Sequence, residues 1–117
     1  MKKIIIIEDD PAIQDAASLI FKKTDYDVTI YRDGNDILSG LFDVPDIFII
    51  DKQLPGVDGL EICKYLKRHE PTKNIPVIIM SASPSIDKTS RSAGADDFME
   101  KPYSIKHLRG LVEKYTL

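Results

Sequence analysis

The sequence predicts an α/β fold in which helices cover both faces of a parallel β-sheet. Strand-like and helix-like segments alternate along the whole chain, and such repeats form parallel sheets through right-handed crossovers. Two strand-like segments, residues 4–7 and 47–50, are isoleucine-rich runs without polar alternation. Runs of this kind are typical of strands that are buried on both faces. Acidic residues follow both runs directly, at residues 8–10 and at Asp51.

The N-terminal half contains three predicted strands and two predicted helices. The first strand spans Lys2–Glu8, and Pro11 then suits the first turn of a helix that is capped by Asp9 or Asp10 and continues to about Lys23. Its apolar residues recur at helical spacing and are Ala12, Ile13, Ala16, Ala17, Ile20 and Phe21. The next predicted elements are a strand over Asp27–Tyr31, a short helix that follows the turn at residues 33–35 and ends near Gly40, and a strand over Asp46–Asp51.

The C-terminal half continues this alternation after a loop marked by Pro55-Gly56. Its predicted elements are a helix over Asp58–His69 that Asp58 caps, a strand over Pro76–Ser81, a strand over Asp96–Glu100 and a last helix that Ser104 caps. The inward-facing residues expected for the two helices are Leu60, Ile62, Cys63 and Leu66, and then Leu108, Leu111, Val112 and Tyr115. Residues 83–93 are polar, with Ile86 as the only large apolar residue, so we expect a short or irregular helix there.

Length and composition limit the classes of protein to consider. The chain has 117 residues, and we expect a single domain over residues 1–117. Hydrophobic residues make up 43% and charged residues 30%, which is typical of a soluble globular protein, and the net charge of -3 gives no reason to expect direct nucleic-acid binding. The sequence contains no apolar run long enough to cross a membrane, and we expect no signal peptide. The single cysteine, Cys63, cannot form an internal disulfide, so we expect a cytoplasmic protein.

Four of the predicted strands end in segments whose side chains could bind a ligand or take part in a reaction. These ends are Glu8-Asp9-Asp10, Asp51, Ser81-Ala82 and Glu100-Lys101-Pro102. Because the carboxyl ends of parallel strands lie at one edge of the sheet, where open α/β sheets bind ligands, we expect them to converge. Carboxylates about 4 Å apart repel one another by roughly 4 kcal/mol at an effective dielectric constant of about 20, so we expect a hard cation such as Mg²⁺ between them. A cation, a hydroxyl and an ammonium group around a nucleophilic aspartate would suit phosphoryl transfer.

Four sequence blocks carry a resemblance to a known family. They are IIIIEDDP at residues 4–11, DIFIIDKQLPGVDGLE at 46–61, PVIIMSAS at 76–83 and AGADDFMEKPY at 93–103. With these blocks in this order, the chain resembles the receiver domain of two-component response regulators over essentially its full length. The resemblance implies a flavodoxin-like (βα)5 three-layer sandwich whose five-stranded parallel sheet has the order 2-1-3-4-5.

The resemblance also implies a phosphoacceptor and a cation site. Asp51 looks like the residue that takes the phosphoryl group, and Asp9 looks like a direct Mg²⁺ ligand. Glu8, where family members often have aspartate, looks like an acid that holds the cation through water, and the backbone carbonyl of Gln53 should complete the ligand set. Two roles stay open for Asp10, which could cap the first helix or belong to this metal site.

A second group of residues looks like those that bind the phosphoryl group and change the protein surface in response to it. Ser81 looks like the hydroxyl that moves toward a phosphoryl oxygen, Ala82 should offer its backbone N–H, and Lys101 should pair with the phosphate. The bond between Lys101 and Pro102 should be a cis peptide. Phe98 stands at the family's aromatic switch position, and its movement with Ser81 is expected to repack the surface of the fourth helix, the fifth strand and the fifth helix.

The expected function is therefore that of a phosphoacceptor domain in a two-component phosphorelay. The donor would be a histidine kinase or a histidine phosphotransfer protein. A downstream target protein would bind the repacked surface, since no output domain follows the last predicted helix, although a fragment of a larger protein would share these features. We expect no enzyme activity beyond self-phosphorylation and autodephosphorylation.

Two other functions stay open. The first is a Mg²⁺-dependent phosphohydrolase that forms an aspartyl-phosphate, although such enzymes have a second carboxylate at the position of Gln53. The second is a pseudo-receiver that binds partners without phosphorylation, although such domains usually lose the acceptor, the acids or the lysine. Nucleotide binding is disfavoured, because no glycine-rich loop opens a helix.

Overall fold

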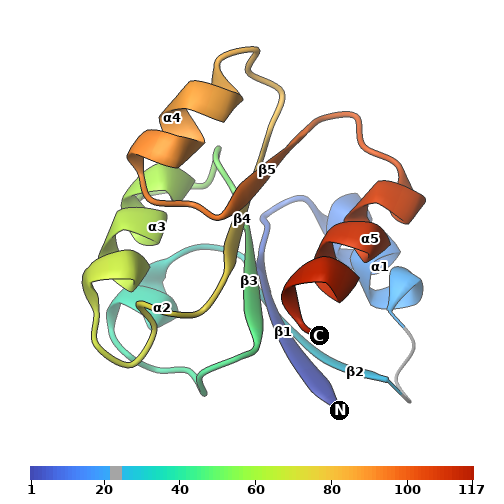
Figure 1. The fold of residues 1–117 in the computed structure, drawn as a ribbon, viewed down its shortest axis with the longest axis horizontal. Helices are drawn as coiled ribbons and strands as arrows, with labels where there is room; N and C mark the ends of the chain where they lie inside the picture. The colour runs from blue at the N-terminus through green and yellow to red at the C-terminus, as the bar shows by residue number, and fades with distance from the viewer. Residues whose placement is uncertain (22–24) are drawn as a thin grey trace.

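In the computed structural model, which describes residues 1–21 and 25–117, the strands form one parallel sheet with helices on both of its faces (Figure 1). The strands are β1 (Lys2–Ile7), β2 (Tyr26–Tyr31), β3 (Ile47–Asp51), β4 (Val77–Ser81) and β5 (Asp97–Glu100). The helices are α1 (Pro11–Ile20), α2 (Asn35–Leu38), α3 (Gly59–Arg68), α4 (Ile86–Ser92) and α5 (Ile105–Tyr115). The strand order β2-β1-β3-β4-β5 confirms the predicted flavodoxin-like arrangement.

The register of the sheet brings the carboxyl ends of its central strands to one edge. Ile7 at the end of β1 lies beside Ile50 of β3, and Asp51 lies beside Met80 of β4. Ser81 in turn lies beside Glu100 at the end of β5. The segments that follow β1, β3, β4 and β5 therefore leave the sheet next to one another.

The apolar runs are buried on both faces, as the lack of polar alternation predicts. Successive side chains of a strand point to opposite faces, and they divide between two apolar cores here. Ile4 and Ile6 of β1 pack in the core beneath α1 and α5, whereas Ile5 and Ile7 pack in the core beneath α2, α3 and α4. Figure 1 shows these two helix layers on either side of the sheet.

Three side chains cap helices at the positions where the sequence predicts a helix start. The carboxylate of Asp10 accepts a hydrogen bond from the backbone N–H of Ala12 at 2.9 Å, and that of Asp58 accepts one from Leu60 at 2.7 Å. The hydroxyl of Ser104 accepts from the N–H of His107 at 3.0 Å. Such bonds satisfy N–H groups that have no partner within the helix. Asp10 is therefore the cap of α1.

The first helix differs from its prediction in length and in the residues it buries. α1 ends at Ile20, and the predicted end near Lys23 falls outside the described residues. Ala17 and Ile20 are buried as predicted, but Ala12 and Ala16 are exposed. Alanine fits either side of a helix because it has little surface to bury, so its spacing says little about which side faces the core.

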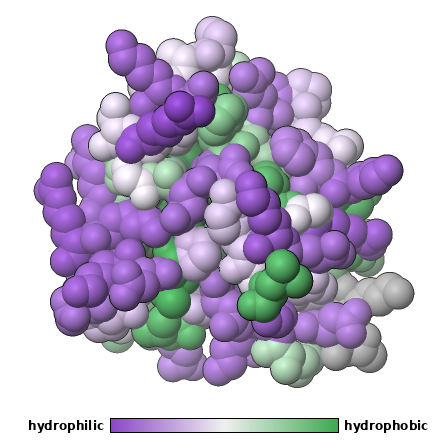
Figure 2. Space-filling view, in the orientation of Figure 1, coloured by the Kyte–Doolittle hydropathy of each residue, from purple (hydrophilic) through white to green (hydrophobic). Residues whose placement is uncertain are grey.

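The other elements follow their predictions within one or two residues. α4 spans only seven residues, which confirms the short helix predicted from its polar sequence, and Ile86 is its buried apolar anchor. Among the described residues no helix has both the length and the apolar character needed to cross a membrane. Hydrophilic side chains cover most of the face drawn in Figure 2, and the hydrophobic areas on it are separate from one another.

The thiol of Cys63 is expected to be unreactive in the folded protein. Its side chain is fully buried on α3, and burial raises its pKa to about 11. Because the reactive species is the thiolate, labelling by a thiol reagent at pH 8 should be slow in buffer and fast in denaturant. Rapid labelling in buffer would contradict the burial of Cys63.

Candidate functional site

Three carboxylates meet at the carboxyl edge of the sheet. Glu8 and Asp9 follow β1, and Asp51 is the last residue of β3. One carboxylate oxygen of each lies within 4.8 Å of the others. Glu8 is fully buried, Asp51 is 5% exposed and Asp9 is exposed, so the cluster has two inner acids and one acid that faces solvent.

An ammonium group also reaches the cluster. Lys101 follows β5, and its Nζ lies 3.2 Å from Asp51 Oδ2 and 3.3 Å from Glu8 Oε1. Burial alone would lower the pKa of Lys101, but the attraction of Asp51 and Glu8 outweighs it and raises that pKa. Lys101 is therefore a cation held beside the carboxylate of Asp51. The peptide bond between Lys101 and Pro102 is cis.

One ammonium faces three acids here, and the pKa of the most buried acid, Glu8, is raised. That pKa is raised to about 7, first because burial disfavours the charged carboxylate and then because Asp51 hydrogen bonds to it and repels its charge. Lys101 acts in the opposite direction. An all-oxygen set of donors with excess negative charge fits a hard divalent cation such as Mg²⁺, which would relieve this repulsion.

The loop after β3 is held tightly against Asp51. The backbone N–H of Gln53 donates to Asp51 Oδ1 at 3.3 Å, and Lys52 Nζ lies 3.5 Å from Asp58 Oδ2 at the start of α3. The N–H of Gly59 donates to the carbonyl of Lys52 at 2.8 Å. This closure places the first turn of α3 directly against the backbone of Asp51.

Ser81 and Phe98 lie on the neighbouring strands rather than within the acid cluster. Ser81 is 4% exposed, its hydroxyl accepts a hydrogen bond from the N–H of Ser83 at 3.0 Å, and its carbonyl accepts one from the N–H of Lys101 at 2.8 Å. Ala82, the next residue, is exposed. Phe98 is half-buried and packs against the core beneath α2, α3 and α4. Among the described residues, no hydrogen bond joins Ser81 to Asp51.

One contact at this edge has no counterpart in the sequence reasoning. The side-chain amide of Gln14 on α1 donates to the backbone carbonyl of Glu8 at 2.6 Å. A polar residue on a surface helix is ordinary, and its partner is a backbone atom, so no pattern of residue types could have indicated this bond.

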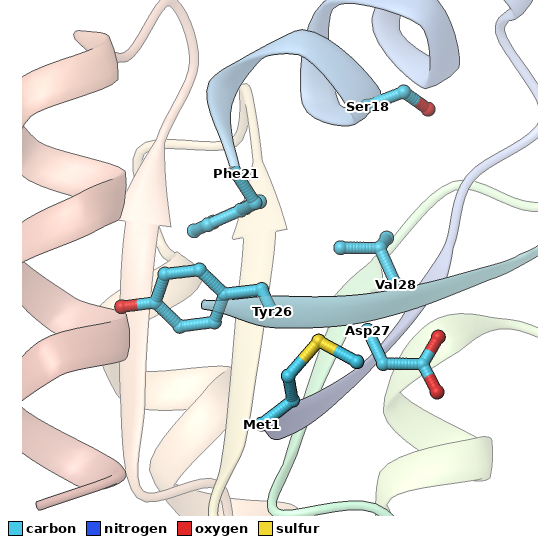
Figure 3. Close-up of a pocket in the computed structure, with 6 residues that line it drawn as sticks. All are labelled: Met1, Ser18, Phe21, Tyr26, Asp27 and Val28. Atoms are coloured by element: carbon cyan, nitrogen blue, oxygen red, sulfur yellow. The ribbon is translucent and has the colours of Figure 1, made fainter. Parts of the chain in front are cut away.

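A separate pocket lies at the other end of the sheet. It has a volume of about 280 Å³ and is lined by residues that include Met1, Phe21 and Tyr26 (Figure 3). Met1 precedes β1 and Tyr26 begins β2, whereas the acids follow their strands, so this pocket is not part of the acid site.

Asp9→Asn is expected to stabilise the cation-free protein and to remove its stabilisation by Mg²⁺. The change deletes one of three repelling charges, and because Asp9 faces solvent the gain should be at most about 1 kcal/mol. Thermal unfolding in EDTA and in Mg²⁺ measures both effects. Asp10→Asn is the matched control, since asparagine caps a helix as well as aspartate does, and it should leave the Mg²⁺ response intact. An undiminished Mg²⁺ response in Asp9→Asn would show that Asp9 does not bind the cation.

Comparison with known proteins gives consistent matches over nearly the whole chain. The family model described as the response regulator receiver domain matches residues 4–113. A curated relative, the DNA-binding dual master transcriptional regulator RpaA of Synechocystis, is 37% identical over 112 residues. The match covers 92% of this chain but 46% of RpaA, so the chain spans less than half the length of that relative.

Two solved structures illustrate the structural similarity. The signal receiver domain of a signal transduction histidine kinase from Syntrophus aciditrophicus has a TM-score of 0.89 at 30% identity, with 99% of this chain and 90% of that chain covered. The receiver domain of the sensor histidine kinase PA1611 from Pseudomonas aeruginosa has a TM-score of 0.86 at 23% identity, with 98% and 97% covered. The latter structure has a magnesium ion coordinated in its active site cleft.

Proposed function

The chain belongs to the response regulator receiver domain family of two-component systems, and from this premise we propose that it accepts a phosphoryl group on Asp51 in a Mg²⁺-dependent reaction. The contact of Asp51 with both Lys101 and the two other acids carries this proposal. A carboxylate that only caps a turn would need neither a buried acid nor a partly buried ammonium group beside it. We take residues 1–117 as one receiver domain, of which the family match covers residues 4–113.

The cation would be held by oxygen atoms from two loops. Asp9 and Asp51 would bind it through their carboxylates, Gln53 through its backbone carbonyl, and Glu8 through water. When bound, Mg²⁺ neutralises charge on the acids and on the phosphoryl oxygens. The magnesium ion of the Pseudomonas aeruginosa receiver and the spacing of the three acids here support this assignment.

Phosphoryl transfer requires little covalent chemistry from the protein. A carboxylate oxygen of Asp51 bonds to phosphorus as the P–N bond of a donor phosphohistidine breaks, and the leaving imidazole nitrogen keeps the electron pair and takes a proton. Lys101 stays protonated throughout and pairs with a phosphoryl oxygen. Ser81 and the backbone N–H of Ala82 donate to other phosphoryl oxygens, which makes the site mainly one of positioning and charge neutralisation.

Phosphorylation would be reported at the surface formed by α4, β5 and α5. The hydroxyl of Ser81, which accepts from the N–H of Ser83 here, would move to donate to a phosphoryl oxygen, and Phe98 would move into the space left behind Ser81. A phosphorylated side chain carries roughly -1.5 to -2 charges, enough to bias such a rearrangement. A downstream target protein would bind the surface in its new form.

The partners follow from the same chemistry. The donor is a histidine kinase or a histidine phosphotransfer protein, and we place the reaction in the cytoplasm, where Cys63 stays reduced. Uptake and loss of the phosphoryl group on Asp51 is self-modification rather than turnover of a substrate. No observation favours a phosphohydrolase or a phosphorylation-independent module. Absence of direct nucleic-acid binding stays a prediction, since RpaA is DNA-binding and more than twice as long as the matched segment.

Removal of the cation tests the proposal. Incubation with acetyl phosphate and Mg²⁺ should add one phosphoryl group to the protein in intact-mass spectra, and EDTA should abolish the gain. Excess Mg²⁺ added after the EDTA should restore it. Uptake that is equal with and without EDTA, or no uptake with any small phosphodonor or cognate kinase, would overturn the proposal.

A further inference from the structure

The turn between β1 and α1 carries two of the three acids and is tied to the helix by Gln14. Nε2 of Gln14 donates to the backbone carbonyl of Glu8 at 2.6 Å. Glu8 lies just beyond the last residue of β1, so its carbonyl has left the sheet. In the part of the chain that the structure describes, the amide of Gln14 is the one hydrogen-bond partner of this carbonyl.

Asp9 depends on this turn more than the other two acids do. Its side chain is exposed and, among the described residues, makes no hydrogen bond or ion pair. Asp51 is aimed by its place in β3 and by the N–H of Gln53. The direction of the Asp9 carboxylate is instead set by its backbone.

The bond from Gln14 acts on that backbone directly. The carbonyl of Glu8 and the N–H of Asp9 belong to one planar peptide group, so a donor that fixes the oxygen also fixes the plane from which Asp9 departs. On the other side of Asp9, the N–H of Asp10 donates to Glu8 Oε2 at 3.3 Å. The backbone of Asp9 is thus held before and after the residue.

We propose that Gln14 is a positioning residue that orients Asp9 for cation binding. The proposal rests on the proposed function, because it assigns Asp9 to the cation. Loss of the amide donor should allow the peptide between Glu8 and Asp9 to rotate. Mg²⁺ affinity should then fall by about tenfold, the lower end of the effect of removing a group that supports a metal ligand. Saturating Mg²⁺ should restore the rate of phosphoryl uptake, since the cation itself can reorder the turn.

Three variants separate this role from a structural one. Gln14→Met keeps the length of the side chain but has no donor. Gln14→Arg restores an N–H, because arginine Nε is the same number of bonds from Cα as glutamine Nε2. Ser18→Arg places the same charge one turn further along α1 and is the charge-matched control for Gln14→Arg. Within residues 1–21 and 25–117, the hydroxyl of Ser18 bonds only to the carbonyl of Gln14 in the same helix.

Calorimetric titration with Mg²⁺ alone is the main measurement. We expect Gln14→Met to bind Mg²⁺ about tenfold more weakly than wild type, and Gln14→Arg to bind it as tightly as Ser18→Arg. Phosphoryl uptake from acetyl phosphate should need more Mg²⁺ in Gln14→Met but reach the wild-type rate at saturation. Wild-type affinity in Gln14→Met, or failure of Gln14→Arg to match Ser18→Arg, would overturn the proposal.

The stability of each variant and its phosphoryl uptake are measured separately from its affinity for Mg²⁺. Thermal unfolding in EDTA shows whether Gln14→Met is folded, and if it is not, the comparison of Gln14→Arg with Ser18→Arg decides. If wild type binds Mg²⁺ but takes no phosphoryl group, the proposed function fails while the titrations still decide the role of Gln14. If wild type binds no Mg²⁺, both proposals fail.

Discussion

Asp51→Asn is expected to abolish phosphoryl uptake without unfolding the protein. The amide has nearly the shape of the carboxylate and keeps an oxygen that can accept from the N–H of Gln53, but it is a poor nucleophile toward phosphorus. The change also deletes one charge from the acid cluster and from the contact with Lys101. Intact-mass spectra after incubation with acetyl phosphate and Mg²⁺ should show a complete loss of the phosphorylated species.

Asp58→Asn provides a control of the same chemistry in the same loop. Asp58 caps α3 through Leu60, and asparagine retains that function, so this variant should still take one phosphoryl group. Equal uptake in Asp51→Asn and wild type would mean that another residue is the acceptor. Loss of uptake in both variants would point to the loop conformation rather than to the nucleophile.

The layers of the fold were predictable because the apolar composition of the strands indicates that they are buried on both faces. Four consecutive isoleucines in β1 leave no polar side for solvent, so both faces of the sheet must be covered, and the strand–helix alternation supplies helices to cover them. The order of the strands was not predictable in this way. Ile4–Ile7 would pack equally well beside any other apolar strand, and the order 2-1-3-4-5 came from the resemblance instead.

The convergence of Asp9, Asp51 and Lys101 followed from topology, since parallel strands share one carboxyl edge. What the sequence could not indicate is how each of them is aimed. Gln14 acts on a backbone carbonyl, and the close approach of α3 to β3 involves a glycine without any side chain. Contacts to backbone atoms leave no trace in hydrophobic periodicity, which records only which side chains are buried.

Gly59→Ala is expected to destabilise the protein by about 3 kcal/mol or more, the range of severe overpacking in a core. A methyl group at Gly59 would overlap the carbonyl oxygen of Asp51 and would lie 2.9 Å from the Cα of Lys52. Both neighbours are backbone atoms of β3 and the loop after it, so they cannot turn aside as a flexible side chain can. Urea unfolding followed by circular dichroism measures the loss.

The same substitution at Gly110 should have the opposite sign. Gly110 lies within α5, and a methyl group there would meet no atom within 4 Å. Gly110→Ala should therefore stabilise the protein by roughly 0.5–1 kcal/mol, because alanine loses less backbone freedom in a helix than glycine does.

Comparison of Gly59→Ala with Gly110→Ala separates the effect of packing against β3 from the general preference of helices for alanine. If Gly59→Ala folds at all, relief of the overlap must move α3 or the backbone of Asp51, and phosphoryl uptake should fall together with stability. A variant as stable as wild type would show that the start of α3 does not press on the backbone of β3. The close packing argued for Asp51 would then be wrong, even with all three acids in place.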